Sequence, residues 1–222
     1  MANPFPVSDT SAAKNLLKVV DLGLIEYSQA YDIQRNSLDG VLRGEPMKLI
    51  LCEHPVVLTM GRMAKETNIL AAKETLAARG IPVHYIDRGG DITLHAPGQL
   101  VVYPILDLNH FKKDLHWYLH GLEQVVIDLL SDFDILGTRF SGRTGVWAGG
   151  RKIASLGVGV RKWITFHGLA LNVNTDLNLF SLIKPCGLDV KMTSLEALRG
   201  QKVDMRLVKE RMLEYFLKDF NL

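Results

Sequence analysis

Three residue types that can carry out nucleophilic catalysis lie within one stretch of the chain, from residue 149 to residue 187. Lys152 stands at the start of an apolar, glycine-containing run, His167 precedes a glycine, and Cys186 lies in a Lys-Pro-Cys-Gly turn. A thiol attacks as its thiolate, and a nearby amine or imidazole promotes this by supplying positive charge or by taking the proton. The stretch therefore predicts a cysteine nucleophile with an activating partner, provided that the fold brings the groups together.

Each of these residues also has a purely structural interpretation. Lys152 follows a Gly-Gly turn and fits a surface lysine, and His167, like His95 further upstream, fits a hydrogen-bonded core histidine. Cys52 ends an apolar run and is expected to be a buried thiol. The two cysteines form no CxxC pair, which favours free thiols in a reducing, cytoplasmic environment. Residue chemistry alone leaves these alternatives open.

Composition narrows the class of protein. The chain has 222 residues, of which 47% are hydrophobic, so we expect one domain over 1–222 with a loose leader over about 1–14. A formal net charge of +2 gives no argument for a nucleic-acid or membrane partner. No run of 18 apolar residues and no signal peptide is evident.

Hydrophobic periodicity predicts the elements that must position the candidate site. Helices are expected over 26–42, 71–79, 114–130, 194–198 and 204–220, with one or two helical turns over 177–183. Strands are expected over 16–22, 47–52, 56–60, 83–86, 99–106, 146–148, 153–160 and 163–173. The last three strands have hairpin-length links, and strict βαβ alternation is missing. The pattern predicts an α+β fold with a mixed, largely antiparallel sheet flanked by helices.

Several familiar devices are absent from the sequence. It contains no GxxxxGK[ST] phosphate loop, no GxGxxG after a strand and no GxSxG elbow. His116 and His120 have metal-ligand spacing, but no third ligand is evident, so no metal site is predicted. Residues 135–175 contain no acidic side chain and six cations, which would form a basic patch if they shared a face.

Four segments together resemble a known family. RGGDITLHAPGQLVVYPILDL, GGRKIASLGVGV, TFHGLALNVNTDLNLFSLIKPCG and MTSL follow one another as in the lipoyl(octanoyl) transferases, of the biotin/lipoate protein ligase-like superfamily. The resemblance spans residues 49–198. One motif departs from the family pattern, because TYHGPGQ is replaced here by TLHAPGQ, with Leu94 and Ala96 in place of tyrosine and glycine.

The resemblance implies an activity without a cofactor. That family transfers an octanoyl group from acyl carrier protein to a lysine of lipoyl domains, in 2-oxoacid dehydrogenase complexes and the glycine cleavage H protein, through a cysteine thioester. The matching cysteine is Cys186, and Lys152 matches the lysine that lowers the thiol pKa or acts as its base. The implied fold is the catalytic domain shared by biotin and lipoate ligases.

The resemblance also implies where the substrate binds. Its substrate-binding stretches fall on Arg88, Gly89, Gly90, Asp91, Ile92, Thr93, Leu94, His95, Ser155, Leu156, Gly157, Gly168, Leu169 and Ala170. His167, beside the last stretch, joins them as a candidate from its own hydrogen-bonding chemistry.

Two other functions remain open at this point. An ATP-dependent ligase of the lipoate or biotin type would use the same fold without needing Cys186. A non-catalytic carrier-protein-binding module would keep Cys186 merely buried.

Overall fold

The computed structural model describes residues 16–185 and 190–222. Its main feature is a seven-stranded sheet in the order β1-β2-β6-β10-β9-β8-β7. These strands are β1 (Leu17–Leu24), β2 (Met47–Glu53), β6 (Gln99–Ile105), β10 (Ile164–Asn172), β9 (Arg151–Arg161), β8 (Arg143–Ala148) and β7 (Gly137–Phe140). β1 and β2 run parallel, and every other neighbouring pair is antiparallel.

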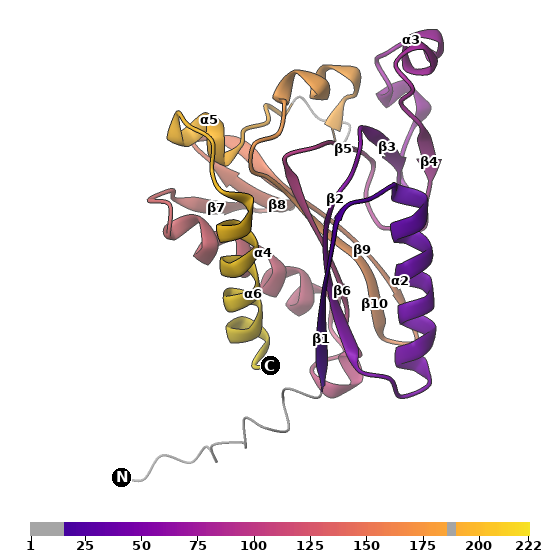
Figure 1. The fold of residues 1–222 in the computed structure, drawn as a ribbon, viewed down its shortest axis with the longest axis vertical. Coiled ribbons are helices and arrows are strands. Elements are labelled where there is room, and N and C mark those ends of the chain that lie inside the picture. The colour runs from indigo at the N-terminus through magenta and orange to yellow at the C-terminus, as the bar shows by residue number, and fades with distance from the viewer. Residues whose placement is uncertain (1–15, 186–189) are drawn as a thin grey trace.

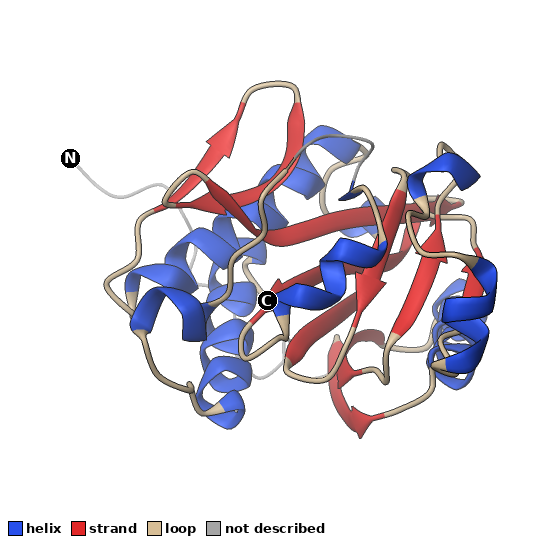
Figure 2. Ribbon diagram, turned by 90° about the horizontal axis from the view of Figure 1, so that it is seen from above, coloured by secondary structure: helices blue, strands red, loops and turns tan. Residues whose placement is uncertain are grey.

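A second, three-stranded sheet has the order β4-β3-β5. It consists of β4 (Val83–Tyr85), β3 (Val57–Met60) and β5 (Ile92–His95). The α-helices are α2 (Tyr27–Leu42), α3 (Lys73–Ala78), α4 (Leu115–Ser131), α5 (Leu195–Arg199) and α6 (Met205–Phe220). Short 3-10 helices are η1 (Glu66–Asn68), η2 (Leu108–His110) and η3 (Leu177–Leu182). Figures 1 and 2 show α2 on one side of the large sheet and α4 with α6 on the other.

The long helices follow directly from local sequence. α6 buries Val208, Met212, Phe216 and Phe220, which are four residues apart and so form one stripe along the helix. The Asp204 carboxylate caps this helix by accepting a hydrogen bond from the backbone N–H two residues on. Local periodicity and capping thus determine the helices on this face of the sheet.

The hydrophobic core has two parts. The larger part lies between the seven-stranded sheet and its helices. A smaller cluster under the three-stranded sheet includes Leu58, Leu94 and Ala96, and η3 contributes Phe180 and Leu182. The segment that leads toward Cys186 is therefore packed against the small sheet.

The predicted fold class is confirmed, with two strands and one sheet missing from the prediction. No strand was predicted over Ile92–His95, which forms β5, or over Gly137–Phe140, which forms β7. β5 pairs with β3 and β7 pairs with β8. The three-stranded sheet exists only through pairing of β3 with segments that follow it in the chain.

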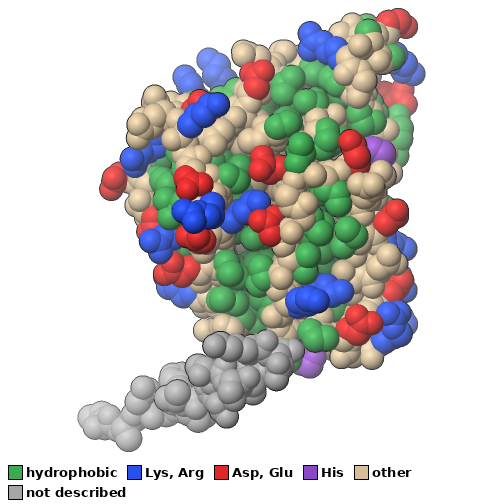
Figure 3. All heavy atoms as spheres, viewed as in Figure 1, with side chains coloured by type: hydrophobic (Ala, Val, Ile, Leu, Met, Phe, Trp, Pro, Cys, Tyr) green, Lys and Arg blue, Asp and Glu red, His purple; other side chains and the backbone are tan. Residues whose placement is uncertain are grey.

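The six cations of residues 135–175 do not share one face, so the condition for a basic patch is not met. Arg151 and Arg161 occupy opposite ends of β9, about 33 Å apart at about 3.3 Å per residue. Lys152 is buried, and Arg139 and Arg161 each form an ion pair with a carboxylate. On the face shown in Figure 3, cationic and anionic side chains are interspersed. Among the described residues, no helix is long and apolar enough to cross a membrane.

Candidate active site

A cleft with an empty volume of about 520 Å³ brings the three predicted substrate-binding stretches together. Its predicted lining residues are Arg88, Gly90, Asp91, Ile92, Thr93, His95, Ser155, Leu156, Gly157, His167, Gly168, Leu169 and Ala170. The first stretch comes from β5 and the loop before it, the second from β9 and the third from β10. Four further lining residues were not predicted: Tyr27, Ile86, Val101 and Tyr103.

Two glycines permit the close packing that forms this cleft. A Cβ on Gly168 would lie 2.1 Å from the Val102 carbonyl oxygen of β6, which no side chain tolerates. A Cβ on Gly157 would lie 2.9 Å from the Gly89 carbonyl oxygen. Because Gly157 has none, the loop before β5 rests on β9, and Gly89 N–H donates to the Val158 carbonyl at 2.8 Å.

Two residues of the first predicted stretch are absent from the cleft lining. Gly89 contacts β9 through its backbone, and Leu94 packs into the small core together with Ala96. The departures from the family motif at Leu94 and Ala96 therefore lie in the packing of the small sheet. The tyrosine hydroxyl that Leu94 lacks belongs to a position outside the cleft lining.

A chain of buried hydrogen bonds extends from the cleft through the large sheet. His95 Nδ1 lies 2.8 Å from Gln99 Oε1, and Gln99 Nε2 donates to Asn172 Oδ1 at 2.9 Å. Asn172 Nδ2 then donates to the Thr193 carbonyl at 2.9 Å. Because Gln99 presents its oxygen, His95 carries its proton on Nδ1 and leaves Nε2 as an acceptor. Burial lowers the pKa of His95 to about 3, so the ring is neutral at physiological pH.

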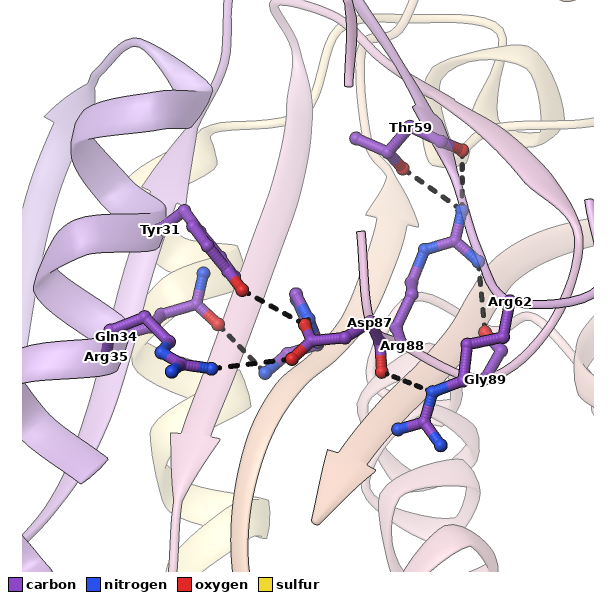
Figure 4. A network of polar contacts seen from close by, with 9 residues as sticks. Tyr31, Gln34, Arg35, Thr59, Arg62, Asp87, Arg88 and Gly89 are labelled. Carbon is purple, nitrogen blue, oxygen red and sulfur yellow. Dashed lines mark hydrogen bonds and ion pairs between the residues drawn. The ribbon is translucent and has the colours of Figure 1, made fainter. Parts of the chain in front are cut away.

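His167 is held in a different way, by a carboxylate at the edge of the cleft. Its Nε2 lies 3.0 Å from Asp87 Oδ1. Asp87 also accepts hydrogen bonds from Tyr31 and Arg35 (Figure 4). The hydrogen bond with His167 is the main reason that the pKa of Asp87 falls to about 2. Burial lowers the pKa of His167 despite the opposing effect of Asp87, so a neutral ring donates Nε2–H to an ionised carboxylate.

The backbone of His167 is itself unusual. Its φ of 55° lies in the left-handed region, which costs a residue other than glycine of order 1–3 kcal/mol. The buried Gln34 side chain of α2 accepts a hydrogen bond from His167 N–H at 2.8 Å and holds this bend. Tyr31 stacks on the imidazole, with ring centroids 5.7 Å apart. Helix α2 thus determines where His167 points.

Arg88 ties the first stretch to the small sheet. Its guanidinium donates to both the carbonyl and the hydroxyl oxygen of Thr59 on β3, at 2.8 and 3.0 Å (Figure 4). It also donates to the Gly89 carbonyl at 3.0 Å. A buried arginine that spans a loop and a strand fixes the glycine-rich segment beside the cleft.

Lys152 is buried near the start of β9, with 3% of its surface exposed. Its ammonium nitrogen donates to the Thr144 carbonyl at 3.1 Å and lies 5.2 Å from the centroid of the Trp147 ring. Its backbone pairs with the segment after the predicted nucleophile, because Lys152 N–H donates to Lys191 O and Thr193 N–H donates to Lys152 O, both at 2.9 Å. The surface interpretation of Lys152 is therefore wrong.

Cys186 lies outside the described residues, but the chain on both sides of it is anchored. Upstream, Lys184 N–H donates to the Asn68 carbonyl at 2.7 Å, and Asn68 Nδ2 donates to Asp91 of the first stretch at 2.6 Å. Downstream, Met192 forms a parallel bridge with Lys152. The other cysteine, Cys52, is fully buried, as expected, and burial raises the pKa of its thiol.

Comparisons with known proteins agree with this site. The family described as "Lipoyl protein ligase A/B catalytic domain" matches residues 26–217. An octanoyltransferase of Solibacter usitatus (strain Ellin6076) is 45% identical over 201 residues, 90% of this chain and 91% of that protein. One from Geotalea uraniireducens (strain Rf4) is 46% identical over 209 residues, 92% and 94% of the two chains.

This chain belongs to the lipoyl protein ligase A/B catalytic domain family. The fold is also similar to that of a solved structure. A bipartite lipoate protein ligase from Thermoplasma acidophilum superposes with a TM-score of 0.69 at 15% identity, covering 92% of this chain and 83% of that one. The predicted resemblance is confirmed, and the chain is an enzyme of the acyltransferase class.

Some residues of the site were not predicted, although the motifs of the family could have indicated them. Gln99, Asn172 and Thr193 lie inside or beside the motifs that carry the resemblance, so their position was a usable signal. Tyr103 also lies inside the first of these motifs, so the same signal applied to it. Tyr27 reaches the cleft from α2 and carries no local pattern that sets it apart, so its side chain is identified only by the packing of distant elements.

Proposed function

We propose that this enzyme transfers an octanoyl group from an acyl carrier protein to a lysine of a lipoyl domain, with Cys186 as the covalent carrier. The observation that supports this most strongly is the environment of Lys152. It is a buried lysine, three residues along β9 from the cleft residue Ser155, and its backbone is bonded to the segment that follows Cys186. The cleft beside it is lined by Leu156, Leu169 and other apolar groups suited to an acyl chain.

In the first step, the Cys186 thiolate attacks the carbonyl carbon of the carrier's octanoyl thioester. The bond from that carbon to the carrier's sulfur breaks, and a new thioester to Cys186 forms. The carrier's sulfur leaves as a thiolate and takes a proton from the Lys152 ammonium group, so the carrier departs with a free thiol and Lys152 becomes neutral. Lys152 promotes this step either by taking the proton of Cys186 or by stabilising the thiolate with its charge.

In the second step, the neutral amine of a lipoyl-domain lysine attacks the same carbonyl carbon. An amide bond forms, the bond to Cys186 breaks, and the thiolate returns. Lys152 receives a proton from the incoming amine. Burial of the acyl chain in the cleft contributes about 0.8 kcal/mol per methylene, which favours a medium-length chain over a short one.

Trapping of the acyl-enzyme tests the proposal. The enzyme is incubated with octanoyl-carrier protein without acceptor and its intact mass is measured, followed by peptide mapping. We expect one octanoyl group on Cys186, removed by hydroxylamine, and a transfer-competent enzyme after Cys52→Ala. A hydroxylamine-sensitive adduct at another residue that is as abundant in Cys186→Ser would contradict the assignment.

The same assay separates this function from the ligase alternative. A ligase would form octanoyl-lipoyl domain from free octanoate and ATP, and Cys186→Ser would leave its rate unchanged. We expect no product from octanoate and ATP, and loss of transfer from the carrier protein in Cys186→Ser.

A further inference from the structure

A buried carboxylate on helix α4 contacts β8, the strand against which the Lys152 side chain packs. Glu123 is 5% exposed, and its Oε1 accepts a hydrogen bond from the backbone N–H of Gly145 on β8 at 2.9 Å. Its Oε2 accepts from Arg139 Nε at 3.0 Å. Both carboxylate oxygens are therefore engaged, one by a charged partner and one by the backbone of β8.

The residues of β8 on either side of Gly145 contact the Lys152 side chain. The Thr144 carbonyl, one residue before Gly145, accepts the hydrogen bond from Lys152 Nζ, and Trp147 lies beside the ammonium group. A Cβ on Gly145 would lie 2.5 Å from Lys152 Cε and 2.8 Å from the Ala154 carbonyl oxygen. The lysine side chain thus passes directly over the one residue of β8 whose amide Glu123 binds.

The backbone at this point departs from a regular strand. Gly145 has a φ of 142°, and the register between β7 and β8 shifts, since Thr138 pairs with Trp147 but Phe140 pairs with Arg143, so that residues 144–146 of β8 lie opposite a single residue of β7. Such a β-bulge redirects side chains and leaves a backbone group outside the regular ladder. Here the amide of Gly145 is bonded to a side chain on a helix, at a position 22 residues away in sequence.

We propose that Glu123 is a positioning residue for Lys152: its carboxylate fixes the bulge of β8 at Gly145, so that the Thr144 carbonyl and the open space over Gly145 hold the ammonium group in place. Glu123 touches neither substrate nor nucleophile in this proposal. It rests on the proposed function of Lys152, and it adds a residue of α4 to the machinery that prepares the thiol.

The effect of Glu123 is distinct from that of a general structural ion pair. Asp39 and Arg161 provide the matched control, because they form an ion pair of 3.1 Å at the far end of β9. Asp39 lies on α2, as Glu123 lies on α4, but its partner is half-exposed and distant from Lys152. Removal of this pair tests whether the loss of any ion pair between a helix and the large sheet alters the thiol.

The experiment measures the pH dependence of Cys186 alkylation by iodoacetamide in the full chain, with the label located by peptide mapping. The variants are Lys152→Ala, Glu123→Ala, their combination, Glu123→Gln and Asp39→Ala. We expect Glu123→Ala to raise the apparent pKa of the thiol by about one unit, which slows alkylation at neutral pH about tenfold. Glu123→Gln keeps an oxygen for the Gly145 amide and restores most of the rate.

The combined variant decides whether Glu123 acts through Lys152. Residues that act through one group are non-additive, so Glu123→Ala is expected to change nothing further once Lys152 is alanine. Circular dichroism and thermal unfolding of each variant identify misfolded protein, and Glu123→Gln gives the result in a chain that keeps the size of the side chain.

Each outcome bears on one proposal. An unchanged alkylation profile in Glu123→Ala overturns the positioning role whatever Lys152→Ala does, and so does a change that persists equally in the Lys152→Ala background. An equal shift in Asp39→Ala would also overturn it. If Lys152→Ala itself leaves the profile unchanged, the proposed function of Lys152 fails.

Discussion

The two ends of strand β9 place cations in opposite environments. Lys152, near its start, is 3% exposed and is bound by a backbone carbonyl and an aromatic ring. Arg161, at its end, has a side chain that is 43% exposed and an ion pair with Asp39. An exposed pair contributes little to stability, whereas a charge among fixed dipoles and little water interacts strongly with its neighbours. The position along the strand, rather than the type of charge, therefore prepares a cation for chemistry.

The two ends of β9 also differ in the hydrogen bonds that connect them to the rest of the protein. From Lys152 the hydrogen bonds continue through Thr193, Asn172 and Gln99 to His95 in the cleft. At the other end, Arg161 has an ion pair on the surface. The start of β9 is thus connected to the cleft by hydrogen bonds, whereas the Arg161 side chain at its end lies at the surface.

The largest expected difference is in catalysis. Lys152→Ala should lower the rate of acyl-enzyme formation by about 10²–10⁴, the range for loss of a positioned acid or base. Arg161→Ala should leave the rate within about twofold, because its loss affects only an exposed pair. Single-turnover acylation followed by mass spectrometry measures both. Similar losses in the two variants would remove the distinction between the ends of the strand.

Next in size is a substitution beside Lys152. Gly145→Ala places a Cβ against the lysine side chain and the Ala154 carbonyl, and its φ of 142° disfavours alanine. We expect a loss of about 1–3 kcal/mol in the free energy of unfolding, with slower acylation. Gly142→Ala is the control, since its φ of 74° carries similar backbone strain but nothing lies within 4 Å of the added Cβ. A chemical denaturation series compares the two, and equal losses would show that strain alone is responsible.

Burial of His95 should make the free energy of unfolding depend on pH. The pKa of His95 is about 3 in the folded state and about 6.5 in the unfolded chain, so below pH 6.5 only the unfolded chain binds the proton. The free energy of unfolding should fall as the pH decreases from 6.5 toward 3, by at most about 1.4 kcal/mol per pH unit for this group.

A histidine variant tests this dependence. In His95→Gln the slope of unfolding free energy against pH below 6.5 should decrease, whatever the absolute stability of the variant. Denaturant titrations at several pH values give both slopes, and the same slope in His95→Gln and the wild type would contradict the expectation.

The smallest effect is expected at the far end of β9. Asp39→Ala removes the partner of Arg161 and should change the free energy of unfolding by less than about 1 kcal/mol. Because exposed pairs are screened, this difference should vanish in high salt. Thermal unfolding at low and high ionic strength measures it, and a large change that persists in salt would mean that this end is also preorganised.

Local features of the molecule could be predicted from the sequence. The helices at 114–130 and 204–220 follow from the spacing of their apolar residues. Asp114 and Asp204 cap them by accepting hydrogen bonds from backbone N–H groups two or three residues on, which are short-range interactions. The three cleft stretches were predicted from the resemblance to the family, whose motifs they match. The roles of Cys186 and Lys152 stay predictions, supported by the resemblance and by the burial of Lys152.

The remaining features arise from contacts between distant residues. β5 forms by pairing with β3, and Leu94 is directed into a small core that no periodicity indicates. In the sequence, Glu123 is one charged residue on an amphipathic helix. Only the packing of α4 on β8 brings its carboxylate to Gly145. Sequence spacing carries no information on such pairs.

The bend at His167 has a consequence for how the enzyme folds. It is secured by Gln34, 133 residues earlier in the chain, so β10 cannot hold its left-handed residue until α2 has docked. Closing so long a loop carries an entropic cost that local elements do not face. The imidazole is therefore oriented late in folding, and a partly folded chain would contain the strand without a competent cleft.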